Sequence, residues 1–309
     1  MDLGDPDREL IRRVTMVADS SRWEGFSFRD DDIVITTPPK CGTTWTQNIC
    51  ALLVFQTPQL PKPIEELSPW LDMLTRSKQE VFTLLEQQRH RRFIKTHTAL
   101  DGLPFDARVS YICVARDPRD VAMSMLNHRA NFDFGALLHA RSEAVGLDDV
   151  AEVLAAGPPV EPESHEEKLW TWMTDSGAEG ASSFGALARH ISGFWEIRDL
   201  PNVLMVHYDD LKSDLSAEMR RIAAFLDIEV NIANWDAMVN AATFEFMKAN
   251  ADRTAPDVSH GLWHSNADFF RNGTSGQWKA VLDDADCQRY VDIARAAFAP
   301  DVYDWLHRT

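Results

Sequence analysis

The chain has 309 residues, of which 45% are hydrophobic and 26% charged, enough to bury a large core in one α/β domain. Its formal net charge of −17 argues against nucleic acid and anionic membrane surfaces as partners. No apolar run is long enough for stable membrane insertion, and the acidic residues 1–9 do not resemble a signal peptide, so we expect a cytoplasmic protein.

An apolar run at residues 33–36 predicts the first strand, and two prolines then lead into Lys-Cys-Gly-Thr-Thr at residues 40–44 and a helix. Backbone N–H groups of such a turn and of the helix N-terminus converge on one point, where the helix dipole favours negative charge. Lys40 and the hydroxyls of Thr43 and Thr44 complete this anion cradle. The ligand expected in this cradle is a phosphate or sulfate group.

The order of residues in this loop excludes two common phosphate chemistries. A Walker A loop carries its lysine after the glycine, whereas Lys40 precedes Gly42. Cys41 is not placed like a phosphatase nucleophile, because position 47 is Gln rather than an arginine that would clamp the phosphoryl oxygens. We expect Cys41 to be a small loop residue whose pKa the helix N-terminus lowers.

Three more short strands are predicted at residues 93–95, 110–114 and 203–206, separated by helical stretches. This alternation indicates an α/β fold with a mainly parallel central sheet flanked by helices, in a single domain over residues 1–309. Two irregular insertions, at about residues 57–75 and 130–165, are expected on the acceptor side of the site. Residues 127–156 are expected to form a helical cover over the acceptor pocket, although amphipathic packing alone would explain them equally well. Residues 157–164 are better explained as a solvated linker.

Polar and charged residues follow each predicted strand, where ligands bind in open α/β sheets. Lys95 and His97 end the second strand, Arg116 follows the third, and Tyr208 follows the fourth. A lone histidine is more often structural than catalytic, and Arg119 is better explained by pairing with a neighbouring aspartate.

The sequence resembles the cytosolic-type sulfotransferases, which use 3′-phosphoadenosine 5′-phosphosulfate (PAPS) and have a P-loop-like fold. Thr-x-Pro-Lys-x-Gly-Thr-Thr-Trp at residues 37–45 is similar to their 5′-phosphosulfate loop, and Arg-x-x-x-Asp-Val-x-x-Ser at 116–124 to their 3′-phosphate signature. Residues 271–279 are similar to the carboxy-terminal Arg-Lys-Gly-x-x-Gly-x-Trp-Lys element, with Asn272 in place of Lys. Residues 242–250 resemble the Thr-Ser-Phe-x-x-Met-Lys-x-Asn element, with Ala242 in place of Thr.

The resemblance implies a set of nucleotide-binding residues. Arg116, Ser124 and Arg271 would hold the 3′-phosphate, Phe244 and Trp45 would stack on the adenine, and Tyr208 would lie near it. For either ring of that pair, packing in the core is the alternative. In full, the implied nucleotide-binding residues are Lys40, Cys41, Gly42, Thr43, Thr44, Trp45, Arg116, Ser124, Tyr208, Thr243, Phe244, Arg271, Asn272 and Gly273.

The resemblance also implies a mechanism without a metal ion. Residues 95–97 match the family's element that carries the catalytic base, so His97 would take the proton of an acceptor hydroxyl. Lys40 would stabilise the bridging oxygen, and Lys95 would assist at the sulfuryl group. Ser124 would hold Lys40 away until an acceptor binds, and the bisphosphate product would be 3′,5′-bisphosphoadenosine (PAP).

Two other functions share some of these features. A P-loop kinase also binds phosphate between a strand and a helix, but it needs Mg²⁺ ligands that are not evident in the sequence. A nucleotide-binding module without catalysis would keep Arg116, Ser124 and Trp45 but would not need His97.

We expect the acceptor to be a small-molecule or lipid hydroxyl compound, and several aromatic residues favour an apolar one: a phenol, an alcohol, a sterol or a glycolipid rather than a small polar sugar. These residues are Trp70, Phe132, Phe134, Phe246 and Trp263. Residues 279–288 depart from the family's dimerisation motif, which leaves the oligomeric state open. The four cysteines have no zinc or redox spacing, and we expect them to be reduced.

Overall fold

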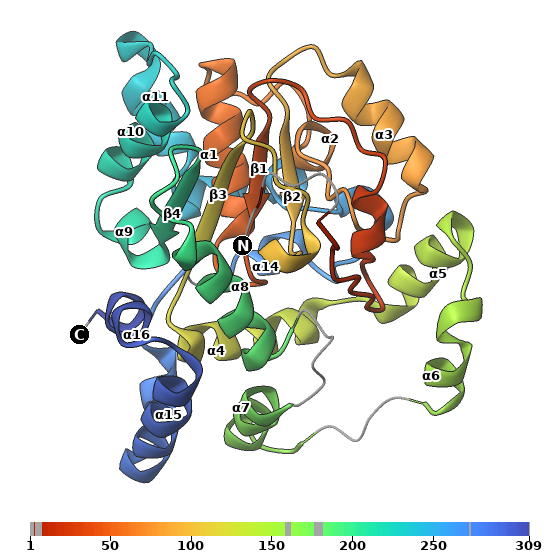
Figure 1. Ribbon diagram of the computed structural model, residues 1–309, viewed down its shortest axis with the longest axis vertical. Coiled ribbons are helices and arrows are strands. Elements are labelled where there is room, and N and C mark those ends of the chain that lie inside the picture. The colour runs from red at the N-terminus through yellow and green to blue at the C-terminus, as the bar shows by residue number, and fades with distance from the viewer. Residues whose placement is uncertain (1–2, 4–7, 158–161, 176–181, 272, 309) are drawn as a thin grey trace.

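The computed structural model describes residues 3, 8–157, 162–175, 182–271 and 273–308. Within them, a single α/β domain is built on four parallel strands (Figure 1). The strands are β1 (Ile33–Thr36), β2 (Phe93–Thr96), β3 (Ser110–Ala115) and β4 (Val203–His207), in the spatial order β2-β1-β3-β4. This confirms the predicted fold class and all four predicted strand positions.

The strands form where short apolar and β-branched runs can be buried on both faces, as parallel strands require. All residues of β1 and β2 are buried, and Ile33 pairs in register with Phe93 of β2 and with Ser110 of β3. Because successive side chains point to opposite faces, Ile33 and Ile35 enter one hydrophobic cluster while Val34 enters another.

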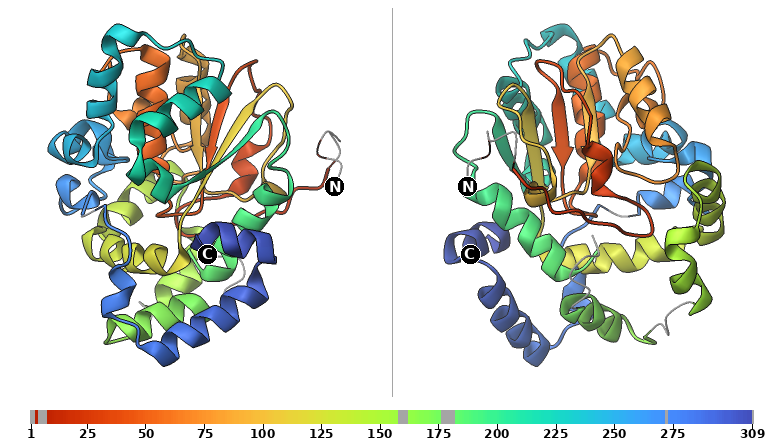
Figure 2. Two further views of the ribbon diagram at one scale, coloured as in Figure 1. Left: turned by 90° about the vertical axis from the view of Figure 1, so that its left-hand side faces the viewer. Right: turned by 45° about the vertical axis from the view of Figure 1, so that its right-hand side comes forward.

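Helices cover both faces of the sheet. The cluster around Ile33 and Ile35 contains side chains from α1 (Thr43–Phe55), α10 (Leu215–Phe225) and α11 (Trp235–Ala241). The opposite cluster contains side chains from α3 (Lys78–Gln87) and α8 (Phe184–Glu196). The views in Figures 1 and 2 show these helices on either side of the strands.

Below the carboxyl ends of the strands, as drawn in Figure 1, lies a second group of helices. α4 (Pro118–Asn131) packs with α7 (His165–Thr174), α15 (Asp284–Ala297) and α16 (Pro300–His307) around their own cluster. α5 (Phe134–Ala144), η3 (Asp148–Val150) and α6 (Ala151–Ala155) make the segment expected as a helical cover largely helical. None of the described residues of these three elements lines the cavity at the carboxyl edge of the sheet, so they do not form the expected cover. Residues 158–161 of the expected linker lie outside the described residues.

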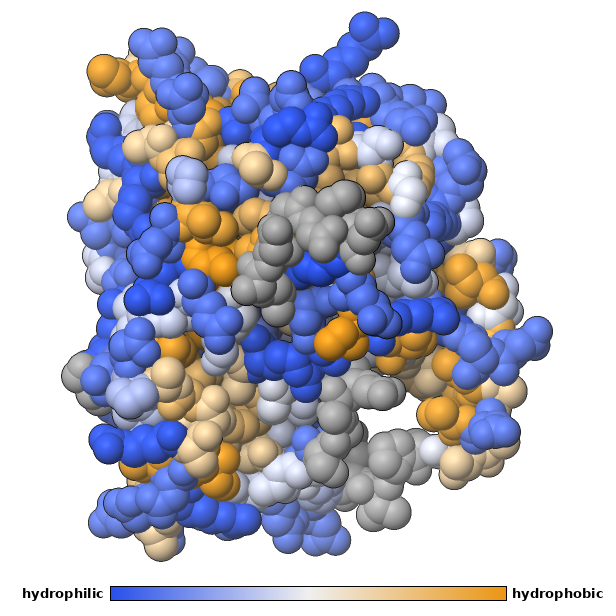
Figure 3. Space-filling model, in the orientation of Figure 1, coloured by the Kyte–Doolittle hydropathy of each residue, from blue (hydrophilic) through white to orange (hydrophobic). Residues whose placement is uncertain are grey.

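Short elements complete the chain. They are η1 (Ser20–Trp23), α2 (Ile64–Leu67), η2 (Leu100–Gly102), α9 (Tyr208–Ser213), η4 (Ile232–Asn234), α12 (Phe244–Ala249), α13 (Ala251–Thr254), η5 (Val258–His260), α14 (Asn266–Phe269) and η6 (Gln277–Ala280). Hydrophilic side chains predominate on the face drawn in Figure 3. In the described parts of the chain, no helix has both the length and the apolar character needed to cross a membrane.

The strand order creates a topological switch point. From β1 the chain passes to β2 on one side, and β3 lies on the other side, so a crevice opens at the carboxyl ends of β1 and β3. Lys40 follows β1, Arg116 follows β3, His97 follows β2 and Tyr208 follows β4. One predicted site residue therefore lies just after the carboxyl end of each strand.

Candidate active site

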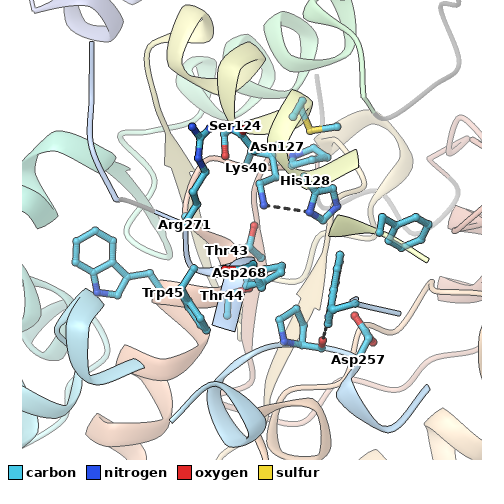
Figure 4. Close-up of a pocket in the computed structure, with 18 of the residues that line it drawn as sticks. Lys40, Thr43, Thr44, Trp45, Ser124, Asn127, His128, Asp257, Asp268 and Arg271 are labelled. Atoms are coloured by element: carbon cyan, nitrogen blue, oxygen red, sulfur yellow. Dashed lines mark hydrogen bonds between the residues drawn. The ribbon is translucent and has the colours of Figure 1, made fainter. Parts of the chain in front are cut away.

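A cavity of about 330 Å³ lies at this edge of the sheet (Figure 4). Its wall combines the loops after all four strands with α4, α12 and the segment between α13 and η6. It brings together most of the residues predicted from the sequence: Lys40, Gly42, Thr43, Thr44, Trp45, Lys95, His97, Arg116, Ser124, Tyr208, Phe244, Arg271 and Gly273.

The loop between β1 and α1 is shaped for an anion. Lys40 has a φ of 66° and Gly42 a φ of 115°, so two residues turn the chain sharply before the helix begins at Thr43. No side chain caps this helix, which leaves its first N–H groups directed at the cavity. A Cβ on Gly42 would lie 3.1 Å from the Tyr208 ring, so the close approach of loop and ring requires glycine.

Lys40 lines the cavity and is partly buried. Its Nζ lies 3.2 Å from Nδ1 of His128 and 4.6 Å from the centre of the Phe269 ring. Burial lowers the pKa of Lys40 to about 7, and the positive charges of Arg116 and Lys95 add to this effect. Burial also holds the pKa of His128 well below its ordinary value, so His128 is a neutral acceptor for the lysine.

His97 lies near Lys40 at the end of the adjacent strand, with its imidazole oriented by the backbone. Its Nδ1 lies 2.7 Å from the carbonyl oxygen of Thr37, an acceptor, so Nδ1 carries the proton and Nε2 has a free lone pair. Burial, with the charge of Lys95 next, lowers the pKa of His97 well below its ordinary value. The ring is therefore a neutral imidazole with an unprotonated nitrogen, which is the form of a general base.

Lys95 is almost fully buried between a carboxylate and an aromatic ring. Its Nζ is 3.8 Å from Asp257 and 4.3 Å from the centre of the Trp70 ring. Burial lowers the pKa of Lys95, and the negative charge of Asp257 opposes the shift. Asp257 has a φ of 56°, a backbone conformation that turns the segment after α13 over the end of β2.

Arg116 is oriented by three contacts. It donates from Nη2 to the carbonyl oxygen of Thr274 at 2.9 Å, and its guanidinium lies 4.2 Å from the centre of the Tyr208 ring. A longer contact from Nη1 reaches the carbonyl oxygen of Lys40. Its buried Nε has no hydrogen-bond partner among the described residues. Arg119, by contrast, pairs with Asp117 at 2.6 Å, as expected for a structural ion pair.

The aromatic residues that we expected around the adenine line the cavity. Trp45 donates from Nε1 to the carbonyl oxygen of Ala242 at 2.8 Å, and its ring meets Tyr208 edge to face at 5.4 Å. Phe244 lies so close to Gly273 that a Cβ there would be 2.8 Å from the ring. Figure 4 shows the side chain of Arg271 extended toward Ser124 of α4.

Three of the predicted nucleotide-binding residues are not in the described wall of the cavity. The Thr243 hydroxyl caps α12 by accepting a hydrogen bond from the Phe246 N–H. The Cys41 side chain is buried in the core, and burial raises its pKa to about 12, so the expectation of a lowered thiol pKa was wrong. Asn272 lies outside the described residues.

The opposite end of the cavity is apolar. Trp70, Phe132 and Trp263 line it as expected, together with Met73, Leu262 and Phe269. Two expected members are absent from this wall in the described structure. Phe134 is 47% exposed on α5, and Phe246 packs against the core beside α1.

Sequence reasoning missed His128, Asp257 and Phe269, which contact the two lysines. For His128 a signal was present, because it lies four residues after Ser124 and so on the same face of α4. Asp257 and Phe269 lie in irregular or very short segments, where no periodic pattern indicates which side chains face a site.

Proteins described as sulfotransferases match nearly the whole chain, both in sequence and in structure. A family model described as "Sulfotransferase domain" matches residues 30–302. A glycolipid sulfotransferase of Mycobacterium bovis is 38% identical over 97% of this chain and 94% of its own length. The structure of mouse sulfotransferase SULT7A1 complexed with PAP matches with a TM-score of 0.68 and 22% identity, covering 94% and 92% of the two chains. Retinol dehydratase with retinol and PAP matches with a TM-score of 0.67 and 20% identity, covering 91% and 85%.

Proposed function

The chain belongs to the sulfotransferase family, and we propose that it transfers the sulfuryl group of PAPS to a hydroxyl of a glycolipid-type acceptor with His97 as general base. The observation that carries this proposal is the orientation of His97. Its Nδ1–H is bonded to the backbone, and its free Nε2 belongs to a ring that lines the same cavity as Lys40.

The cavity fits a bisphosphorylated adenine nucleotide. The uncapped N-terminus of α1, with Lys40 and the hydroxyls of Thr43 and Thr44, supports binding of the 5′-phosphosulfate. Arg116, Ser124 and Arg271 line the cavity together, and their charges and hydroxyl support binding of the 3′-phosphate. The faces of Trp45 and Phe244 suit a purine. Two structural neighbours were solved with PAP bound.

The nucleotide supplies an activated sulfuryl group. Side chains of the protein accept the proton of the acceptor and stabilise the negative charge that develops. His97 takes the proton of the acceptor hydroxyl through Nε2. The acceptor oxygen forms a bond to sulfur while the bond from sulfur to the 5′-phosphate oxygen breaks, and PAP leaves. Lys40 stabilises the charge that develops on that phosphate oxygen, and Lys95 stabilises the sulfuryl oxygens.

The shape of the acceptor end supports a lipid-linked hydroxyl. Trp70 lies against His97 and Lys95, and Phe132 and Trp263 line the same cavity, so an acceptor can bury an apolar part while a hydroxyl reaches the base. The mycobacterial relative at 38% identity is named a glycolipid sulfotransferase. We therefore expect a glycolipid to be a better acceptor than a free sugar.

A transfer assay with radiolabelled PAPS tests the proposal. The acceptor panel should contain glycolipids, the matching free sugars, phenols, sterols and aliphatic alcohols. Label is expected to pass to glycolipids more efficiently than to the free sugars. Labelling of free sugars alone would contradict the assignment of the apolar wall to the acceptor.

Two controls separate this function from the alternatives. A kinase-like phosphotransferase would lose turnover in EDTA, whereas sulfuryl transfer by these side chains should continue. A non-catalytic module would bind PAP in calorimetry and transfer no label to any member of the panel.

A further inference from the structure

α4 contributes Ser124 to the cavity, and it also contributes His128, whose Nδ1 is hydrogen-bonded to Lys40. We propose that His128 is a positioning residue that holds the Lys40 amine at the acceptor end of the cavity and so suppresses transfer of the sulfuryl group to water. The inference rests on the proposed function, because it concerns the charge that Lys40 supplies in that reaction.

The geometry shows where the amine is held. Its contacts are Nδ1 of His128 at 3.2 Å and the face of Phe269 at 4.6 Å. Figure 4 shows the amine directed toward His128 and away from Trp45 and Arg271, which mark the nucleotide end. Among the described residues no hydrogen bond joins Lys40 to Ser124, although the sequence resemblance assigned the holding role to that serine.

The same imidazole is part of the apolar wall. Its ring centre lies 4.9 Å from that of Trp263, 6.0 Å from that of Phe132 and 6.1 Å from that of Phe269. All four side chains line the cavity. One ring therefore touches both the surface on which an acceptor would bind and the amine that must move to the leaving phosphate.

This arrangement has a chemical consequence when no acceptor is bound. Water could then attack, its oxygen bonding to sulfur as the bond to the 5′-phosphate oxygen breaks, to release PAP, sulfate and a proton. A lysine on the phosphate oxygen would accelerate this loss just as it accelerates transfer. Holding the amine on His128 withholds that charge, and an acceptor that displaces the ring releases it.

Two substitutions of His128 test the role. His128→Phe keeps an aromatic ring but removes the acceptor of the lysine proton. His128→Asn places an acceptor oxygen on Cγ, where Nδ1 is attached. Without an acceptor, PAPS hydrolysis should rise about tenfold in His128→Phe, the change that corresponds to about 1.4 kcal/mol, and stay near the wild-type rate in His128→Asn.

The matched control is His139→Phe, which makes the same change on the exposed surface of α5. It should leave hydrolysis and transfer unchanged. His128→Leu replaces His128→Phe if thermal melts show that the latter does not fold. A folded His128→Phe or His128→Leu variant that binds PAP normally and hydrolyses PAPS at the wild-type rate would overturn the proposal.

A second measurement does not depend on catalysis. Brief labelling with acetic anhydride, followed by mass spectrometry of the peptide that contains Lys40, reports how free the amine is. Labelling should rise several-fold in His128→Phe and not in His128→Asn or His139→Phe. Absence of any PAPS turnover in the wild type would refute the proposed function, whereas equal labelling in all variants would refute the holding contact itself.

Discussion

Lys40 and His97 face one cavity from neighbouring strands, and burial lowers both pKa values with opposite consequences. For His97 the lower pKa favours the neutral form that accepts a proton. For Lys40 a pKa of about 7 means that the free enzyme loses the useful positive charge just above neutral pH. The two residues therefore set opposite limits on the active pH range.

The pH dependence of kcat/KM for PAPS should reflect these two groups of the free enzyme. On the acid side it should fall only well below 6.5, the ordinary pKa of histidine, because His97 must be neutral. On the alkaline side it should fall as the pH rises through about 7, because Lys40 must be protonated. In Lys40→Arg the alkaline decline should disappear, since arginine stays charged. An unchanged alkaline decline in this variant would show that another group is responsible.

Lys40 and Arg116 should differ when each is truncated to alanine. Lys40→Ala removes a charge needed in the transition state, so kcat should fall by a factor of about 10² to 10³. Arg116→Ala removes a buried charged donor from an anchoring phosphate and should weaken PAP binding by about 2–5 kcal/mol. Calorimetry with PAP and steady-state kinetics on both variants check this difference. Full PAP affinity in Arg116→Ala would exclude its assigned role.

His97→Ala should lower transfer by a factor of about 10² to 10⁴ while PAP affinity stays close to wild type, because a general base is lost but no phosphate contact is. Transfer to a phenol should suffer less than transfer to an aliphatic alcohol, since the phenol gives up its proton more readily. Thermal melts and a transfer assay on the same sample provide the check, with exposed His139→Ala as control. Near-normal transfer to both acceptors in a folded variant would place the base elsewhere.

At the scale of elements, the site depends on how closely the N-terminus of α1 approaches α9. Gly42 makes this possible through its φ of 115° and the space that its missing Cβ leaves for Tyr208. The guanidinium of Arg116 packs against the same Tyr208 ring. One ring therefore connects the anion loop to the arginine after β3.

Gly42→Ala should disturb this junction in two ways. The backbone strain should cost about 1–3 kcal/mol of stability, and the shifted Tyr208 should weaken PAP binding. Gly146→Ala is the matched control, because Gly146 also has a positive φ, 86°, but has open space where its Cβ would be. Denaturation and calorimetry should show a stability loss in both variants and a loss of PAP affinity only in Gly42→Ala. Equal PAP affinities would mean that the close approach to Tyr208 is unimportant for binding.

At the scale of the whole molecule, several histidines are wholly or partly buried, His190 and His207 completely and His97, His128 and His307 in part. Burial lowers the pKa of His190 to about 4, and the pKa values of His97, His128, His207 and His307 are lowered for the same reason. Between each lowered pKa and the ordinary value of 6.5, the unfolded chain binds more protons than the folded one. Acid therefore favours unfolding.

The free energy of unfolding should thus decrease as the pH falls below 6.5, by about 1.4 kcal/mol per pH unit for each histidine that stays neutral in the folded state. For His190 the decrease should continue down to a pH of about 4. Urea denaturation at a series of pH values checks the slope. His190→Gln, which retains a polar group near Thr36, should reduce it, and exposed His139→Gln should not. A stability that is flat from neutral to mildly acidic pH would contradict this account.

The sequence alone determined the strands, the fold class and many of the residues that line the cavity. Strands β1 to β4 are short apolar runs, and residues that follow a strand in a parallel sheet must lie at its carboxyl edge. The positions of Lys40, His97, Arg116 and Tyr208 follow from this local rule. Arg119 was also correctly interpreted, because its partner Asp117 is only two residues away.

Only the tertiary structure decided what these side chains touch. Lys40 and His128 are 88 residues apart, and their hydrogen bond depends on where α4 lies below the strands (Figure 1). Phe134 and Phe246 are as apolar as Phe132, yet only Phe132 faces the cavity, because helix orientation selects the face. The pKa of Cys41 likewise follows from burial rather than from its place before a helix. Such properties depend on contacts between distant segments, whose packing no local pattern specifies.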